Sequence, residues 1–308
     1  MEMVAKQESI TGFIAIIIWC ALSAGAYVFT GFIEESVDPI LLCFGVFLVT
    51  TLFFGMTNFK KAIQIKRKYK DNFKNIMLVN ITTFGCWFLT LYPLKYIEPS
   101  IVNSVILTAL PIATLIIGYV LSTNKNVNNI DYIISALLFF GIFFLALVCF
   151  SQKSAMKNIS LHDALIAFMS CVGGGIFLAI NNIYTKKLSN NGFSPFDILT
   201  VRFVLITIIS GILSYSMIGK LHNIKLILDI LIIAGSLIIV PQIVFQYSLR
   251  DLEPITISIV APLMPILVFF SEFYNKQLHP TTWTIAGVVY ISVISIVGTI
   301  IRYRKVTK

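Results

Sequence analysis

The chain has 308 residues, of which 57% are hydrophobic and 12% are charged, and its formal net charge is +9. Soluble domains carry charge at about 25% of their positions, so this chain has too little polar surface to cover a water-soluble fold. This composition excludes a soluble enzyme, a disordered chain and a secreted disulfide scaffold, and it indicates a polytopic membrane protein.

Ten apolar stretches are long enough to cross a bilayer, because a membrane helix needs about 20 apolar residues. The first five are residues 9–33, 39–59, 75–94, 99–124 and 132–152. The second five are residues 164–185, 198–219, 230–249, 254–271 and 277–301. The sequence therefore predicts an all-α polytopic membrane protein with ten transmembrane helices.

The basic residues predict which loops face the cytoplasm. If the N-terminus is inside, sixteen Lys and Arg fall in inner segments and six in outer loops. By the positive-inside rule we expect both termini in the cytoplasm. The basic cluster at residues 60–74 could also contact anionic lipid, although an orientation signal is the simpler interpretation. Abundant Ile, Lys and Asn suggest an AT-rich bacterial genome, and hence a bacterial inner membrane.

A short pattern recurs at an offset of about 155 residues. Residues 91–99 are Leu-Tyr-Pro-Leu-Lys-Tyr-Ile-Glu-Pro, and residues 246–254 are Gln-Tyr-Ser-Leu-Arg-Asp-Leu-Glu-Pro. Each copy ends one span and begins the next with Glu98-Pro99 or Glu253-Pro254, and Glu and Pro both suit a helix N-terminus. Because each half holds five spans, the second copy should be inverted. We therefore expect a first repeat at 1–155 and an inverted repeat at 156–308.

These features resemble the EamA-type family of the drug/metabolite transporter superfamily. The resemblance rests on the two five-helix repeats, Trp19 in the first span, the Glu-Pro turns, and Ser-Glu-Phe-Tyr-Asn-Lys-Gln-Leu at 271–278 before a span that contains Gly287. The first copy has Gly118-Tyr119 where the family pattern has a Glu, and Phe44-Gly45-Val46 where it often has an Arg. These departures leave the fold assignment intact but weaken a charge-based mechanism.

Polar and aromatic side chains within the spans are candidates for a substrate site, since such groups face the bundle interior or a water-filled path. Asn80 and Trp87 share a helix face with Phe84 and Leu91 by their spacing. The candidate substrate-binding residues are Trp19, Tyr27, Asn80, Trp87, Asn103, Gln242, Gln246 and Ser258. For each of them, interhelical hydrogen bonding or core packing remains an alternative. We favour that alternative for Asn181 and Asn182, and Gly173-Gly174-Gly175 predicts close helix packing.

Two charged residues interrupt the spans. Arg202 lies one or two turns from the inner end of its span, so we expect its side chain to snorkel to the interface. Glu272 is the candidate for coupling transport to protons, with a structural carboxylate as the alternative. The rest of the predicted path carries amides, hydroxyls and rings, which would suit a polar neutral or zwitterionic metabolite.

The leading functional prediction is a secondary transporter that moves a small polar metabolite by alternating access. The family resemblance and the weakly charged path suggest export of an amino acid or a related compound. Two alternatives remain: an exchanger or importer of a nucleotide-like metabolite such as S-adenosylmethionine, and a non-transporting receptor or assembly factor.

The chain lacks the motifs of other membrane machines. It has no GxxxxGK[ST] loop, HExxH helix or CxxC pair, which disfavours ATP drive, an intramembrane enzyme and a zinc site. We therefore expect neither an enzyme nor a cofactor or metal. The expected partners are a small-molecule substrate and the lipid bilayer, without nucleic acid, and a homodimer is compatible with the sequence.

Overall fold

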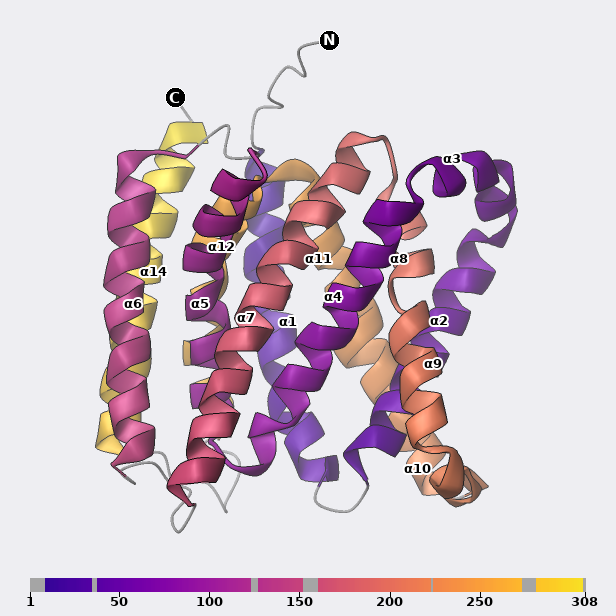
Figure 1. Ribbon diagram of the computed structural model, residues 1–308, viewed down its shortest axis with the longest axis horizontal. Helices are drawn as coiled ribbons and strands as arrows, with labels where there is room; N and C mark the ends of the chain where they lie inside the picture. Colours follow the sequence, from indigo (N-terminus) through magenta and orange to yellow (C-terminus); the bar gives the residue numbers. More distant parts are fainter. Residues whose placement is uncertain are drawn as a thin grey trace.

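The computed structural model describes residues 9–34, 38–122, 127–151, 160–222, 224–272 and 281–306. Within these ranges the regular elements are all helical, and no strand is present. The helices stand side by side in a wide bundle (Figure 1). The start of α1 (Ile10–Glu34), the end of α14 (Thr282–Val306) and α3 (Lys66–Asp71) lie on one side. We call this side the terminal face and the other side the opposite face.

The remaining elements follow in chain order. The first half also contains α2 (Pro39–Gln64), α4 (Phe73–Leu91), η1 (Pro93–Lys95), α5 (Pro99–Val120) and α6 (Asn129–Phe150). The second half begins with α7 (Leu161–Asn190), α8 (Pro195–Arg202), α9 (Val204–Leu213), η2 (Tyr215–His222) and α10 (Ile224–Ile232). It continues with η3 (Ile233–Ile239), α11 (Val240–Asp251), α12 (Pro254–Val260), η4 (Ala261–Leu263) and α13 (Met264–Glu272).

Seven helical stretches within the described ranges are long and apolar enough to cross a membrane. They are Ile40–Lys61, Pro99–Val120, Asn129–Phe150, Leu161–Asn190, Pro195–Leu213, Ile224–Asp251 and Thr282–Arg304. Two shorter apolar helices, Ile10–Gly25 and Pro254–Phe270, accompany them. The all-helical, multi-pass fold is confirmed, whereas the number of ten spans stays a prediction.

Proline and polar caps begin several of these helices. Pro39, Pro99, Pro195 and Pro254 stand at their first positions, where a missing N–H costs nothing. Asp38 accepts hydrogen bonds from two amides of the first turn of α2, and Ser194 forms a capping box with Asp197. These starts follow from short-range sequence signals, which is why the sequence predicts them.

Three of the predicted spans contain interruptions that the sequence analysis did not predict. The span at 198–219 breaks at Phe203 between α8 and α9. The span at 230–249 contains the π-helical η3, and the span at 254–271 contains the 3₁₀ segment η4. Pro262 lies inside η4 and removes a backbone donor there. The basic segment at 60–74, expected to be a loop, instead forms the end of α2, α3 and the start of α4.

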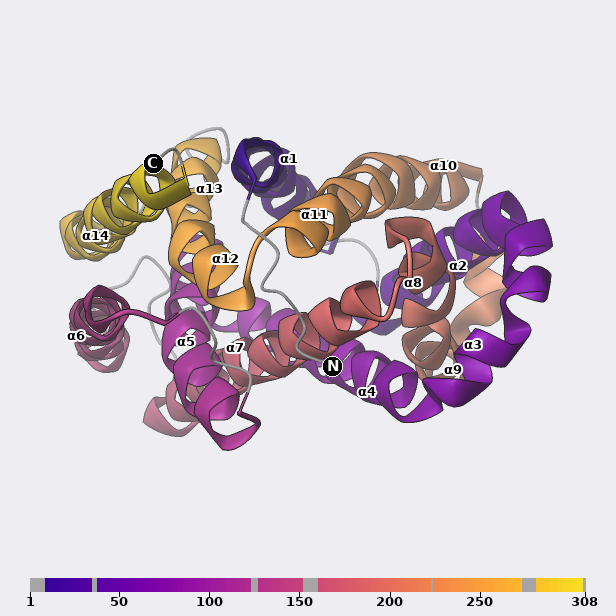
Figure 2. The same cartoon turned by 90° about the horizontal axis from the view of Figure 1, so that it is seen from above.

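The two predicted halves make matching contacts. In the first half, α4 and α5 both pack against α7, the first helix of the second half. In the second half, α11 and α13 both pack against α1, the first helix of the first half. α2 also meets its counterpart α9, and α6 meets its counterpart α14. Figure 2 shows α6 and α14 at one end of the bundle, with α2 and α3 at the other. Helices at the same position in the two predicted halves therefore pack against helices at the same position.

The two Glu-Pro turns lie on opposite faces of the bundle. Glu98 is buried, and its Oε1 accepts a hydrogen bond from Thr284 Oγ1, at the start of α14 (3.4 Å). At the terminal face, Lys186 Nζ near the end of α7 donates to the carbonyl oxygens of Arg250 (3.1 Å) and Leu252 (2.7 Å). The two turns that share the Glu-Pro pattern are thus on opposite sides of the bundle.

α5 lies at the centre of the larger hydrophobic core and is buried without interruption from Ser100 to Pro111. α7 packs closely along it because Gly175 has no side chain. A Cβ atom at Gly175 would lie 2.5 Å from the carbonyl oxygen of Ile106 and 2.8 Å from Ala109 Cβ. The predicted close approach at the glycine run is therefore confirmed at Gly175.

Candidate substrate site

Arg202 is the last residue of α8, and its side chain lies inside the bundle with only 3% exposure. Its Nε donates to Thr83 Oγ1 on α4 (3.3 Å), and its guanidinium carbon lies 5.7 Å from the ring centroid of Phe203. In the described part of the chain, Nη1 has no hydrogen-bond acceptor and no carboxylate forms an ion pair with the guanidinium. The prediction that Arg202 snorkels to the interface is wrong, because Thr83 holds the side chain against α4.

Thr83 connects Arg202 with α7. Asn181 Nδ2 lies within 3.0 Å of the Val79 carbonyl oxygen and within 2.9 Å of the hydroxyl oxygens of Thr82 and Thr83. These contacts join α7 to α4, so the interhelical role favoured for Asn181 is confirmed. The same Thr83 oxygen accepts from Arg202, which fixes α4, α7 and α8 relative to one another.

Three buried amides accompany Arg202. Both polar atoms of Asn182 and Gln246 lack a hydrogen-bond partner in the described structure, and so does Gln242 Oε1. At 1.5 Å per residue, Arg202, Asn182 and Gln242 lie roughly 10–14 Å along their helices from the terminal face. Their helices α7, α8 and α11 pack against one another. We call Arg202, Asn182, Gln242 and Gln246 the polar layer.

Two aromatic clusters include sequence neighbours of the polar layer, Phe245 before Gln246 and Phe203 after Arg202. Trp19 on α1 is buried and packs against Phe245, next to Gln246, with ring centroids 4.6 Å apart. Trp87 on α4 contacts Phe47 at 5.2 Å, and Phe47 stacks on Phe203 at 5.5 Å. Both tryptophans are therefore packed against other rings, which is the core interpretation that the sequence analysis left open for them.

Asn80 lies beside the break between α8 and α9. Its Nδ2 donates to the carbonyl oxygens of Ile76 (3.0 Å) and Val201 (2.7 Å), and its Oδ1 accepts from the amide of Leu205 (3.1 Å). In an unbroken helix the Leu205 amide would bond to the Val201 carbonyl. The Asn80 side chain therefore bridges two backbone groups that the break at Phe203 separates.

The remaining predicted site residues lie elsewhere. Asn103 on α5 is buried, with Nδ2 3.9 Å from Met264 Sδ and Oδ1 without a partner in the described structure. Ser258 Oγ donates to the Ile255 carbonyl within its own helix (2.8 Å). Tyr27 lies in α1 and Glu272 ends α13, but the side chains of both lie outside the described residues. Gln242 and Gln246 thus lie on α11, which packs against the helix α8 that carries Arg202, whereas Asn103 lies on α5 and Ser258 on α12.

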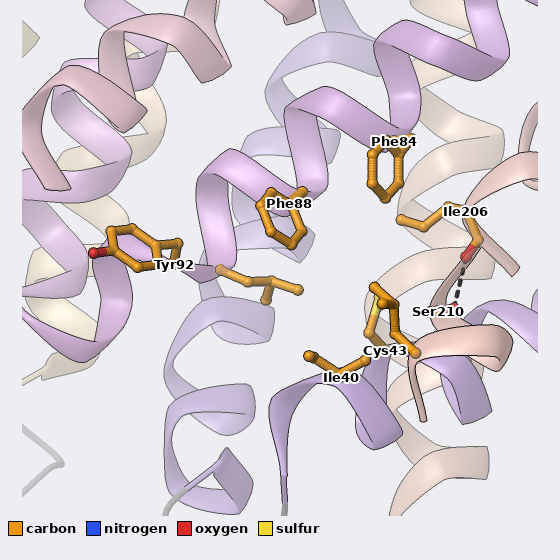
Figure 3. A pocket seen from close by; sticks show the side chains of 9 residues that line it. Ile40, Cys43, Phe84, Phe88, Tyr92, Ile206 and Ser210 are labelled. Atoms are coloured by element: carbon orange, nitrogen blue, oxygen red, sulfur yellow. Dashed lines mark hydrogen bonds between the residues drawn. The ribbon is translucent and has the colours of Figure 1, made fainter. Parts of the chain in front are cut away.

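A pocket with a volume of about 150 Å³ lies near the opposite face, between the start of α2, the end of α4 and α9 (Figure 3). Its lining residues are Ile40, Cys43, Phe84, Phe88, Leu91, Tyr92, Ile206, Ser210 and Leu213. Ser210 Oγ is bonded to the Ile206 carbonyl, so the lining is largely apolar. None of the predicted substrate-binding residues lines this pocket. The spacing of Phe84, Phe88 and Leu91 on one helix face is the sequence signal that indicates it.

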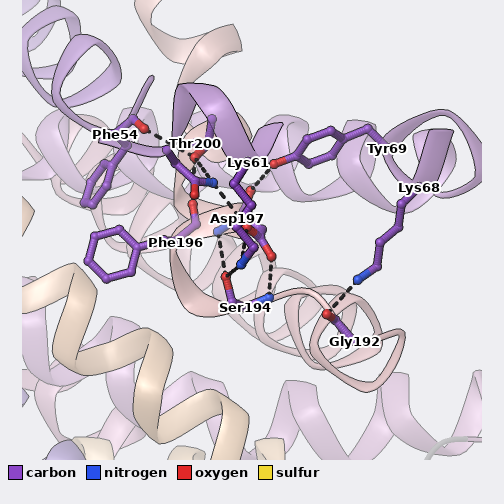
Figure 4. Close-up of polar contacts among 10 residues, drawn as sticks. Phe54, Lys61, Lys68, Tyr69, Gly192, Ser194, Phe196, Asp197 and Thr200 are labelled. Carbon is purple, nitrogen blue, oxygen red and sulfur yellow. Dashed lines mark hydrogen bonds and ion pairs between the residues drawn. The ribbon is translucent and has the colours of Figure 1, made fainter. Parts of the chain in front are cut away.

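The terminal face is closed between α2 and α8 by a polar network (Figure 4). Asp197 Oδ1 lies 3.0 Å from Lys61 Nζ and 3.1 Å from Asn58 Nδ2. Lys61 Nζ also donates to Ser194 Oγ (3.0 Å), while Asp197 Oδ2 accepts from the Ser194 amide (2.8 Å). We call Asn58, Lys61, Ser194 and Asp197 the latch. The Asp197 side chain is 2% exposed, so the latch excludes water from the centre of this contact.

α3 covers the latch from outside. Tyr69 OH donates to the Asp197 carbonyl (3.1 Å), and Lys68 Nζ donates to the Gly192 carbonyl (2.6 Å). Partial burial, together with the nearby charge of Asp197, raises the pKa of the Tyr69 phenol to about 12. The phenol therefore stays protonated, and remains a donor, throughout the physiological pH range.

A family model described as the EamA-like transporter family matches residues 10–147 and 165–299. The chain belongs to the EamA-like transporter family. The family is part of the drug/metabolite transporter superfamily, and its two matched segments fall within the two predicted repeats. The protein is therefore a membrane transporter, in agreement with the resemblance found in the sequence and with the expectation of a non-enzyme.

One solved structure similar to this EamA-family protein is described only as "Crystal structure of protein". It is 11% identical in sequence, with a TM-score of 0.64, and the match covers 94% of this chain and 93% of that chain. At this identity the likeness establishes the fold alone. No curated protein matches the chain.

Proposed function

We propose that this EamA-family protein exports an amino acid or a related zwitterionic metabolite across the bacterial cytoplasmic membrane by alternating access. The observation that carries this proposal is the buried guanidinium of Arg202, which has no carboxylate partner in the described structure. A buried cation without a counter-charge is costly in a membrane protein. A substrate carboxylate would compensate that charge through the two-pronged hydrogen bonding that arginine favours.

The amides of the polar layer are suited to the other end of a zwitterion. An ammonium group has three donors and no acceptor, so it needs oxygen atoms around it. Gln242 Oε1, Gln246 Oε1 and Asn182 Oδ1 are buried acceptors without partners in the described structure. A small amino acid between Arg202 and these oxygens would satisfy groups that each cost about 1–3 kcal/mol when buried unpaired.

The two faces support alternating access because they are closed to different degrees. The latch and α3 close the terminal face above the polar layer, and the apolar pocket lies on the side of the opposite face. The matching contacts of the two halves and the opposed Glu-Pro turns support ten spans arranged as two inverted five-helix repeats. The basic residues of α3 support a cytoplasmic terminal face, with both termini inside.

α8 is suited to couple substrate binding with opening. This helix of eight residues carries Asp197 of the latch near its start and Arg202 of the polar layer at its end. The break at Phe203 separates it from α9, and both helices pack on α2. We infer that the break lets α8 tilt as a unit relative to α9. A substrate bound at Arg202 would thereby shift Asp197 relative to Lys61. Glu272 remains the proposed candidate for proton coupling.

A counterflow experiment in proteoliposomes tests the carboxylate assignment. Vesicles containing the full chain are loaded with an unlabelled amino acid, and uptake of the labelled compound is measured for a panel of amino acids and their carboxamides. We expect the acids to exchange and the carboxamides to exchange at least tenfold more weakly, because a charge-assisted hydrogen bond contributes about 1.5–3 kcal/mol. Equal transport of acid and carboxamide would exclude recognition of the carboxylate.

Variants test whether Arg202 is responsible for the preference for acids over carboxamides. We expect Arg202→Gln to raise KM for the acids about tenfold or more and to abolish the difference between acid and carboxamide. Arg304→Gln removes one positive charge from the exposed end of α14. It should leave unchanged both KM for the acids and the difference between acid and carboxamide. If Arg202→Gln retains the wild-type preference for acids, Arg202 does not bind the carboxylate.

A further inference from the structure

α3 has two chemically different sides. Lys68 and Tyr69 are partly buried; Lys68 bonds to Gly192 between α7 and α8, and Tyr69 bonds to Asp197 in α8. Lys66, Arg67, Lys70 and Asp71 are exposed, and α3 has no buried residue. One side of α3 therefore holds the latch region, and the other presents three cations and one carboxylate to the surroundings.

Five cations on α3 and on the adjoining ends of α2 and α4 have no protein partner in the described part of the chain. They are Lys60, Lys66, Arg67, Lys70 and Lys74, all of them exposed. Within the described structure, their side chains form no hydrogen bond or ion pair, and Asp71 is the single acidic residue in the sequence from 60 to 74. Clustered cations repel one another, so this cluster is stabilised by binding anions.

An exposed apolar stripe on α2 leads to these cations. Leu52, Met56, Phe59 and Ile63 follow one another at helical spacing, with 54%, 78%, 63% and 59% exposure. The stripe ends beside Ile65, where α2 gives way to α3 and Lys66 and Arg67 follow. On a membrane-crossing helix, such a stripe faces lipid chains, and the cations at its end lie at the level of the headgroups.

We propose that this surface binds an anionic phospholipid, with its phosphate held by Lys66, Arg67 and Lys70 and an acyl chain lying along Leu52, Met56, Phe59 and Ile63. The charge complementarity and the order of the groups, apolar stripe first and cations at its end, match one amphiphile oriented in a bilayer. Cations near an anionic surface each strengthen binding about fivefold. An orientation signal acts during insertion and would give the folded protein no preference among lipids.

The test measures lipid selectivity of the purified full chain in nanodiscs of phosphatidylcholine. Spin-labelled phosphatidylglycerol or spin-labelled phosphatidylcholine is added, and the motionally restricted fraction gives their relative association constants. We expect the wild type to favour phosphatidylglycerol several-fold. We expect Lys66→Gln/Arg67→Gln/Lys70→Gln to lower that preference to near one. Nanodiscs expose both faces, so a change of membrane orientation in the variant does not alter the measurement.

A matched variant distinguishes binding at α3 from an effect of the protein's net charge. Arg304→Gln/Lys305→Gln/Lys308→Gln removes three cations at the C-terminal end of the chain and should leave the preference unchanged. The proposal would be overturned if both triple variants lost the preference for phosphatidylglycerol equally, or if the α3 variant kept it. The charge-preserving Lys66→Arg/Lys70→Arg variant should keep the preference. Thermal melting should be the same for all variants, because none of the α3 positions is buried.

Two further arms identify the ligand as a lipid. Inorganic phosphate at millimolar concentration should not displace the spin-labelled phosphatidylglycerol, whereas displacement would assign the cations to a free anion. Phe59→Ser/Ile63→Ser should weaken phosphatidylglycerol binding without changing any charge, and an unchanged association constant would remove the acyl-chain part of the proposal. These measurements do not depend on transport, so they stand or fall independently of the substrate.

Discussion

Thr51 and Thr207 face each other between α2 and α9, with their hydroxyl oxygens 2.9 Å apart. They are 156 residues apart in the sequence, close to the offset between the two Glu-Pro turns, and the stacked rings of Phe47 and Phe203 have the same separation. Residues separated by about the offset of the sequence repeat therefore meet at one place in the bundle. The contact between Thr51 and Thr207 can be tested by crosslinking.

We predict that Thr51→Cys/Thr207→Cys will form a disulfide under mild oxidation. The chain is cut by a protease site inserted at residues 152–159, and the two fragments should stay linked on a non-reducing gel. Thr51→Cys/Ile212→Cys is the control, because Ile212 is an exposed residue of α9 one turn or more away, and it should give separate fragments. Efficient crosslinking of the control pair would contradict the assigned contact.

Asn80→Ala is expected to destabilise the protein by about 1–3 kcal/mol, because it leaves the Val201 carbonyl and the Leu205 amide buried without partners. Thermal denaturation in detergent should show a lower midpoint. Asn190→Ala removes an exposed asparagine at the end of α7 and should change the midpoint little. A midpoint for Asn80→Ala as high as that of the wild type would mean that the bridge contributes nothing to stability.

Gly175→Ala is expected to cost about 1–3 kcal/mol, since the new Cβ would lie 2.5 Å from the Ile106 carbonyl oxygen and α5 would have to move. Gly55→Ala is the matched control: it is also a helical glycine, but no atom lies within 4 Å of its added Cβ. The control should be neutral or slightly stabilising because Ala favours helix. Equal melting midpoints for the two variants would contradict the packing argument.

Asp197→Asn should loosen the terminal face. The variant loses the charge that attracts Lys61, which is half exposed, so its effect on stability should be about 1 kcal/mol or less. Hydrogen–deuterium exchange should become faster at residues 191–197, where the latch and α3 protect the backbone. Asp71→Asn neutralises an exposed carboxylate on α3 and should leave that exchange unchanged. Unchanged exchange in Asp197→Asn would show that the ion pair does not hold this face closed.

Short-range signals allowed much of this architecture to be predicted. The long apolar runs specify membrane helices, because unpaired backbone groups are intolerable in lipid. The residues Pro39, Pro99, Pro195 and Pro254 specify where helices begin, since proline is favoured at the first helical position. The repeated Glu-Pro turn and its context were enough to identify the family. Each of these signals acts within one or two helical turns, so the sequence by itself determined them.

The site depended on contacts between distant segments, which only the tertiary structure decided. Asn80 and Val201 are 121 residues apart, and Arg202 meets Thr83 across 119 residues. The sequence analysis therefore expected Arg202 at the interface and did not predict the break at Phe203, because neither follows from local spacing. The amide oxygens of Asn182, Gln242 and Gln246 lack partners in the described structure for the same reason: which buried amides find hydrogen bonds is determined by the helices that pack around them.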